Sequence, residues 1–126
     1  MTVQDVINGF GSSKGPELAA YANELFQEAI RLGMELNNQY HTLEEIREIM
    51  GRLTGKEMDP TFRLFPPFYT DFGKNITIGR DVFINSGCHF QDQGGIEIGD
   101  RQRGGAVVRT LSSRQVGQGG ESSCRL

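Results

Sequence analysis

Large apolar side chains recur at every sixth residue in one stretch of this chain. They are Ile78, Ile84, Phe90 and Ile96. A helix repeats its buried face every three or four residues and a strand every two, so neither gives this spacing alone. Short strands joined by tight turns and wound around a triangular prism do, with one inward side chain per side. The spacing therefore predicts a parallel β-helix of hexapeptides.

Residues between these positions support the same interpretation. The small or medium companions expected four places after an inward residue are Val82, Cys88 and Gly94. Residues that tolerate the backbone angles of a corner are Gly79, Asn85, Gly87, Gly94 and Gly95. A further repeat begins at Ile98, two residues out of step, and the period ends at Asp100.

The first sixty residues predict a helical hairpin. Pro16 suits a first helical position, and an apolar face follows at spacings of three and four until Gly33, where we expect the helix to end. That face comprises Leu18, Ala22, Leu25, Ala29 and Leu32. Thr42 and Glu45 form a capping-box pattern for a second helix closed by Gly55. Its apolar face comprises Leu43, Ile46, Met50 and Leu53. Two such short helices need another surface on which to bury these faces.

An aromatic and proline-rich connector follows, from residue 61 to about residue 75. Pro66 and Pro67 exclude helix and favour an extended path. Within it, Asp71 precedes Gly73, and composition alone favours a turn role for this aspartate.

Charge divides the chain at residue 100. The whole chain has 13 Lys+Arg and 16 Asp+Glu. The last 26 residues contain five Arg and one Glu, a net of +4, which leaves −7 for residues 1–100. All eleven aromatic residues lie before residue 91. The tail thus lacks the large apolar groups that offset ordering entropy, and we expect residues 101–126 to be disordered.

Other classes of protein receive little support. No apolar run approaches the roughly 20 residues of a membrane span, and the N-terminus lacks the pattern of a signal peptide. Two isolated cysteines, Cys88 and Cys124, favour reduced thiols in a cytoplasmic protein over a disulfide framework. The five arginines of the tail give weak support to nucleic-acid binding, which remains an unfavoured alternative.

Residues 16–100 resemble the maltose and galactoside O-acetyltransferases, a branch of the hexapeptide-repeat acyltransferases. The segments that carry the resemblance are Asn37–Asn38, "PPFYTDFGKNITIG" and "FINSGCHFQDQGGIEIGD". The resemblance implies a mainly β fold, in which a helical hairpin precedes a left-handed parallel β-helix. It also implies a homotrimer that transfers acetyl from acetyl-CoA, as co-substrate and without a metal, to a sugar hydroxyl.

The resemblance also implies an acceptor pocket. Its matching residues here are Asp71, Phe83, Asn85 and Asp92. Phe83 would form a wall, Asn85 would offer a hydrogen bond from a corner, and the two carboxylates would accept bonds from sugar hydroxyls. Asn85 has a second interpretation, as a simple corner residue.

The general base of the reaction is missing from the pattern. Deprotonating a sugar hydroxyl calls for a group that titrates near neutrality, usually histidine. The family's histidine lies beyond the point of departure, and the two histidines here, His41 and His89, do not correspond to it. His41 suits a helix entrance instead. Adjacent Cys88 and His89 would point to opposite faces of a strand, and two separated histidines do not make a zinc site. No catalytic residue is therefore assigned.

These observations predict three regions and two function classes. The regions are residues 1–60 (helical), 61–100 (connector and first coil) and 101–126 (a tail foreign to the family). A shifted reading frame or an alternative end would explain the tail.

Little more than one coil would leave unpaired upper edges and a marginally folded protein. In the first function class, the chain descends from an O-acetyltransferase and is inactive by itself. Alternatively, it is a non-catalytic subunit that associates with full-length copies.

Overall fold

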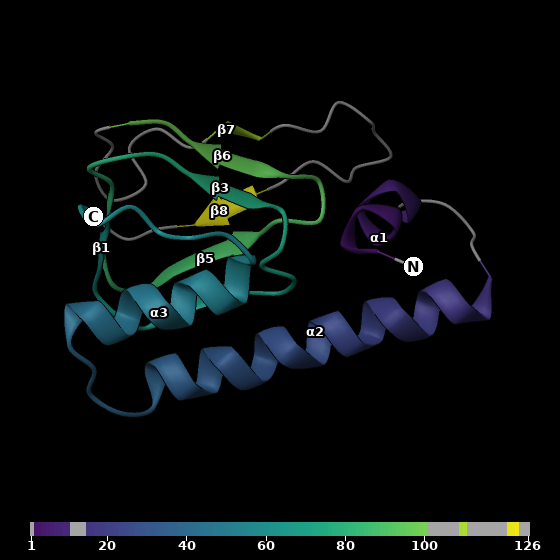
Figure 1. Cartoon of the computed structure of the whole chain (residues 1–126), viewed down its shortest axis with the longest axis horizontal. Coiled ribbons are helices and arrows are strands. Elements are labelled where there is room, and N and C mark those ends of the chain that lie inside the picture. Colours follow the sequence, from purple (N-terminus) through teal and green to yellow (C-terminus); the bar gives the residue numbers. More distant parts are fainter. Residues whose placement is uncertain (1, 11–14, 101–108, 111–120, 124–126) are drawn as a thin grey trace.

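The computed structural model describes residues 2–10, 15–100, 109–110 and 121–123, with side chains for the first two ranges. Helices come first and short strands follow (Figure 1). The helices are α1 (Val3–Gly9), α2 (Pro16–Asn37) and α3 (Leu43–Thr54). The strands are β1 (Arg63–Leu64), β2 (Phe68–Thr70), β3 (Ile76–Ile78), β4 (Phe83–Ile84), β5 (Cys88–Gln91), β6 (Ile96–Ile98), β7 (Arg109–Thr110) and β8 (Glu121–Ser123). In the described part, no helix is both long and apolar enough to cross a membrane.

Helix α2 begins as the sequence predicts and ends later. Pro16 is its first residue, but the helix continues through Gly33 to Asn37. The expected end at Gly33 was wrong because the next turn is apolar on the correct side: Leu36 is fully buried in the core. This burial outweighs the cost of about 1 kcal/mol for glycine in a helix interior.

Helix α3 begins and ends where the sequence predicts. The hydroxyl of Thr42 accepts from the backbone N–H of Glu45, whose carboxylate accepts from the N–H of Thr42. Gly55 closes the helix in the left-handed conformation, with φ of 72°. Helix α1 was not predicted, although Thr2 and Asp5 form the same reciprocal cap at its start.

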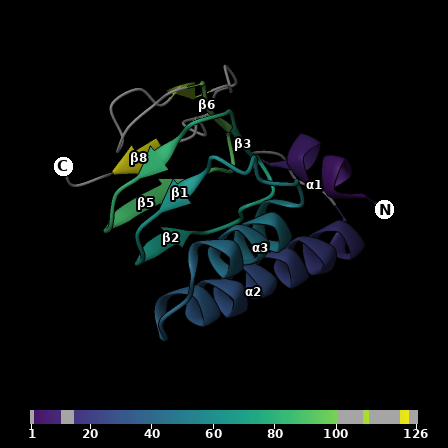
Figure 2. The same ribbon diagram turned by 60° about the vertical axis from the view of Figure 1, so that its left-hand side comes forward.

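The strands form a parallel coil in which one turn takes 20 residues. Arg63 pairs with Phe83, Phe68 with Cys88, and Ile76 with Ile96. The segment predicted as a connector thus supplies β1, β2 and β3 and is itself the first turn. The described chain therefore contains about two turns, where the sequence predicted little more than one. Figure 2 shows the two turns lying above α2 and α3.

The six-residue pattern marks the interior of this coil. Phe90 and Ile96 are 0% exposed and Ile84 is 1% exposed, all in one core cluster with the helices. Ile78 is half-buried and packs against that cluster. Cys88 is also fully buried, and it is disulfide-bonded, so the expectation of a reduced thiol was wrong here.

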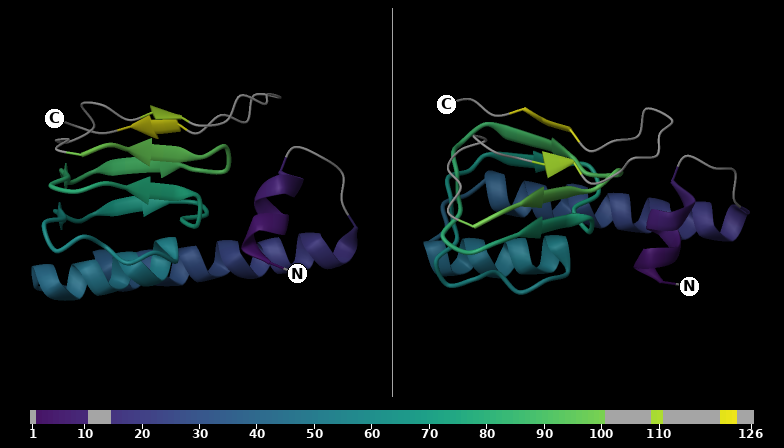
Figure 3. Two further views of the ribbon diagram at one scale, coloured as in Figure 1. Left: turned by 45° about the horizontal axis from the view of Figure 1, so that its top comes forward. Right: turned by 90° about the horizontal axis from the view of Figure 1, so that it is seen from above.

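The predicted fold class needs correction, because the protein is not mainly β. Helices α1, α2 and α3 contain 7, 22 and 12 residues, whereas each strand has two to four. A triangular coil places few residues per side in regular strand, and one end of this coil is covered by two helices (Figure 3). The described chain therefore combines a helical layer with a short β-coil.

Side chains from the helical layer pair with the lower edge of the first turn. The amide of Asn37 donates to the carbonyl oxygen of Phe68 and accepts from its N–H, both at 2.9 Å. Arg47 Nε donates to the carbonyl oxygen of Phe62 at 2.9 Å, and Lys56 Nζ donates to that of Ile76 at 2.9 Å. These polar groups substitute for the strand partners that the first turn lacks on this side.

The upper edge of the second turn is also partly covered by further strands. Strand β8 pairs antiparallel with β5, and β7 pairs antiparallel with β6. Within the described residues, the sheet of β1 and β4 has no third strand. The expected open edge was therefore wrong for β5 and β6. The predicted disorder of the tail otherwise falls outside the described residues.

Candidate functional site

The predicted acceptor residues lie at two corners of the coil. The first corner follows strands β2 and β5, and the groups around it donate hydrogen bonds to the Asp92 carboxylate. The side chain of Asp92 is 0% exposed, in the turn that leads to β6. Oδ1 accepts hydrogen bonds from Thr70 Oγ1 at 2.8 Å, Phe72 N at 3.2 Å and Gly73 N at 3.0 Å. Oδ2 accepts from Asn75 N at 3.1 Å. The carboxylate thus joins the second turn of the coil to the corner of the first.

Burial raises the pKa of Asp92 above its ordinary value, because the charged form loses hydration. The donors at Gly73, Thr70 and Asn75 oppose this rise, whereas the carboxyl group of Asp71 adds to it. The field of Asp92 reaches the helical layer: burial lowers the pKa of Lys56, and the nearby Asp92 carboxylate counteracts that shift.

Asp71 lies beside Asp92 but remains half-buried. Its Oδ1 accepts from the backbone N–H of Asp92 at 3.3 Å, and its Oδ2 accepts from Gln93 Nε2 at 3.2 Å. Gly73, two residues later, has φ of 85°, which agrees with a turn at this point. No pattern in the sequence pointed to Gln93, whose contact depends on the fold.

The second candidate corner follows β4. Phe83 meets Phe65 edge-on with ring centroids 5.0 Å apart, and the guanidinium of Arg63 lies 5.5 Å from the Phe83 centroid. Asn85 is half-buried, and its Oδ1 accepts from the backbone N–H of Ser86 at 2.8 Å. This bond between adjacent residues agrees with a corner role for Asn85. It uses the side-chain oxygen of Asn85 and not its amide nitrogen.

The four predicted acceptor residues do not form one pocket within this chain. Asp71 and Asp92 meet at the end of β5, whereas Phe83 and Asn85 precede its start. A four-residue strand such as β5 spans about 13 Å, so the two pairs occupy separate corners of the prism. The expectation of one pocket came from the family resemblance, whereas the 20-residue turn brings together only residues about 20 apart, such as Asp71 and Asp92.

The two histidines lie apart from each other. Nε2 of His41 donates to the carbonyl oxygen of Glu35 at 2.8 Å, and its Nδ1 lies 3.4 Å from the carboxylate of Glu45. These contacts join the end of α2 to the start of α3, as predicted for a helix entrance. His89 is exposed on β5, with its ring 6.1 Å from that of Tyr69. In the described part, no three His, Cys, Asp or Glu side chains are placed to hold a metal.

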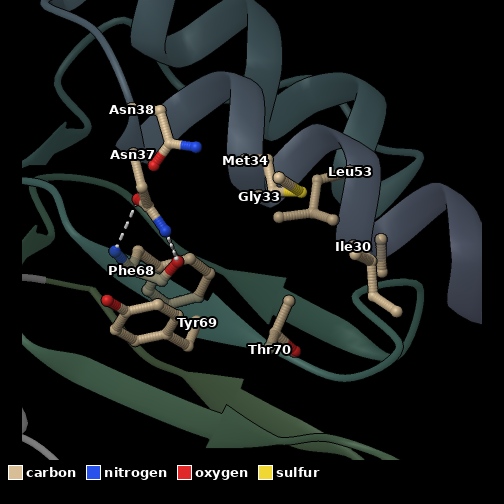
Figure 4. Close-up of a pocket in the computed structure, with 10 residues that line it drawn as sticks. Ile30, Gly33, Met34, Asn37, Asn38, Leu53, Phe68, Tyr69 and Thr70 are labelled. Carbon is tan, nitrogen blue, oxygen red and sulfur yellow. Dashed lines mark hydrogen bonds between the residues drawn. The ribbon is translucent and has the colours of Figure 1, made fainter.

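A groove of about 230 Å³ lies between α2 and β2 (Figure 4). Its lining residues are Ala29, Ile30, Gly33, Met34, Asn37, Asn38, Leu53, Phe68, Tyr69 and Thr70. Three large side chains at its rim are half-exposed: Ile30 at 51%, Met34 at 57% and Tyr69 at 50%. Sequence reasoning missed this groove, because its two walls are about 35 residues apart in the chain.

Gly33 lines this groove from inside helix α2, where glycine is an unfavourable residue, and this leads to a testable prediction. A Cβ at this position would meet no atom within 4 Å. Gly33→Ala should therefore raise the free energy of unfolding by about 0.5–1 kcal/mol through helix propensity, measured by urea denaturation. Gly51→Ala in α3 is the matched control, because its Cβ would lie 3.3 Å from the carbonyl oxygen of Lys56. A smaller gain at position 33 than at position 51 would contradict this account.

Comparison with known proteins agrees with the coil. A crystal structure of the hexapeptide-repeat acetyltransferase VCA0836 from Vibrio cholerae matches with a TM-score of 0.65 and 29% identity, covering 82% of this chain and 53% of that one. Nodulation protein L of Rhizobium meliloti is 32% identical over 75 residues, which are 60% of this chain and 37% of that protein. Over this part of its length, the chain is similar to hexapeptide-repeat acetyltransferases. No model of a known protein family matches it.

A second structure of this family bears on the cofactor. VCA0836 in complex with acetyl coenzyme A matches with a TM-score of 0.55 and 25% identity, covering 82% of this chain and 57% of that one. The chain thus spans little more than half of the VCA0836 chains and about a third of Nodulation protein L.

Proposed function

We propose that the chain derives from an acetyl-CoA-dependent O-acetyltransferase that acts on a sugar hydroxyl, with a left-handed coil and a trimeric assembly. The observation that carries this proposal is the match of 82% of the chain to a hexapeptide-repeat acetyltransferase bound to acetyl-CoA. The corner geometry supports an acceptor with several hydroxyl groups, because carboxylate and amide groups lie at successive corners of the coil.

The contacts to the acceptor would come from three side chains. Asp71 would accept a hydroxyl hydrogen, Asn85 would donate from its amide nitrogen, and Phe83 would cover an apolar sugar face. Because these residues lie at two corners, a sugar contacts both sets only where a second copy brings them together. The sugar could instead use one corner alone.

Deprotonation of the acceptor hydroxyl needs a general base, and neither histidine of the isolated chain is placed to act as one. His41 is engaged between α2 and α3, and His89 lies on an outer face beside Tyr69. We therefore expect the isolated chain to transfer acetyl slowly or not at all. The alternative function, a non-catalytic subunit, is favoured by the sheet of β1 and β4, which has only two strands in the described chain.

An acetyl-transfer assay tests the function. The purified chain is incubated with acetyl-CoA and maltose or a β-galactoside, alone and mixed with intact VCA0836, while free thiol and acetylated sugar are measured. We expect no sugar-dependent thiol release by the chain alone. We also expect acetyl-CoA or sugar to raise its melting temperature. In the mixture, Asn85→Ala should change the rate, whereas Ser86→Ala should not.

Each outcome of this assay has a distinct meaning. Turnover by the chain alone would show that a base is present after all. Absence of any response to both acetyl-CoA and sugars, alone and in the mixture, would contradict the proposed function.

A further inference from the structure

The carboxylate of Asp92 is bonded inside the protein, with three donors on Oδ1 and one on Oδ2. A carboxylate offers about four acceptor sites. Asp92 is 0% exposed and accepts four hydrogen bonds, from Thr70, Phe72, Gly73 and Asn75. A sugar hydroxyl could reach it only after the chain opened, because the Asp92 side chain is not exposed to solvent.

Asp71 differs from Asp92 in each of these respects. It is half-buried, and each of its oxygens receives one of the two hydrogen bonds described above, from Asp92 N and Gln93 Nε2. About two acceptor sites therefore remain for hydroxyl groups. Asp71 also lies inside the turn from Thr70 to Asn75 that the Asp92 carboxylate holds together.

We propose that Asp92 is a positioning residue, and that the acid offered to an acceptor hydroxyl at this corner is Asp71, oriented by Gln93. The assignment of Asp71 to an acceptor rests on the proposed function. The role of Asp92 rests on geometry alone. Asp92 binds the Thr70 hydroxyl before Asp71 and two backbone N–H groups directly after it. Its own N–H and the Gln93 amide set the direction of the Asp71 carboxylate.

Amide hydrogen exchange on the full chain tests the role of Asp92. In the unmodified protein, the amides of Phe72, Gly73 and Asn75 should be protected. Asp92→Leu removes their acceptor but can prevent folding. Asp92→Asn is therefore the deciding variant, because it keeps the size of the side chain but replaces one of the two acceptor oxygens with an NH₂ group, which cannot accept from these amides.

Asp92→Asn should speed exchange about tenfold at the amides that lose their acceptor, either Phe72 and Gly73 or Asn75. Gln91→Leu, on the exposed side of β5, should leave all three amides at the wild-type rate. Wild-type exchange rates at all three amides in folded Asp92→Asn would overturn the proposal. Equal acceleration by Gln91→Leu would overturn it too.

Sugar titration tests the orientation of Asp71. Maltose and a β-galactoside are titrated into the full chain by NMR, in the presence of acetyl-CoA. Asp71→Asn and Gln93→Leu should each weaken sugar binding about tenfold, the effect of roughly one hydrogen bond, without lowering the melting temperature. Gln91→Leu is the matched control, because Gln91 is exposed on β5, two residues away.

The two experiments separate the two ideas. An equal effect of Gln93→Leu and Gln91→Leu, or no effect of either, would overturn the orienting role of Gln93. If the unmodified chain binds neither sugar, the proposed function and the acceptor role of Asp71 fail. The exchange data still decide whether Asp92 holds the corner.

Discussion

Phe90→Ala is expected to lower the free energy of unfolding by about 3–5 kcal/mol, the usual cost of emptying a packed aromatic site. Phe90 is 0% exposed, at the centre of the second turn of the coil. Its ring meets that of Phe68 in the first turn edge-on, with centroids 5.1 Å apart. The substitution therefore removes one of the contacts that join the two turns, and urea denaturation followed by circular dichroism measures the loss.

His89→Ala is the control for this prediction. His89 is the preceding residue on the same strand, but its side chain points outward and is exposed. We expect a change within about 0.5 kcal/mol, as for most surface positions. Similar losses at positions 89 and 90 would show that the strand has no distinct inner face, and the six-residue pattern would lose its structural meaning.

Asn37→Ala is expected to cost about 2–4 kcal/mol. The Asn37 side chain satisfies both the N–H and the carbonyl oxygen of Phe68, a residue that is 1% exposed. Its removal leaves two backbone groups without a partner at the lower edge of β2, each worth about 1–3 kcal/mol. Thermal and urea unfolding measure the loss, and faster amide exchange at Phe68 locates it.

Asn38→Ala provides the comparison. Asn38 is the adjacent residue, of the same type and exposed. Its replacement should change stability by no more than about 0.5 kcal/mol. If Asn38→Ala proved as costly as Asn37→Ala, the loss would reflect the end of α2 in general and not a substitute for a β-strand partner.

The sequence by itself determined the local units of this protein. The capping box at Thr42 and Glu45 fixed the start of α3, because both partners lie within one turn of helix. The spacing of Ile84, Phe90 and Ile96 identified the interior of the coil, because a strand's alternation and the corner residues between strands are also local properties. The resemblance to hexapeptide-repeat acetyltransferases was carried by the same stretch and the segment before it.

Only the tertiary structure decided how these units meet. Residues 20 apart become neighbours in the coil, so Asp71 joins Asp92 and Gln93 while Phe83 and Asn85 lie at another corner. Asn37 reaches the edge of β2 across 31 residues, and α2 continues past Gly33 because Leu36 is buried in the core. The physical reason is that hydrogen bonding and burial depend on which distant groups arrive at one place, and no local pattern records that.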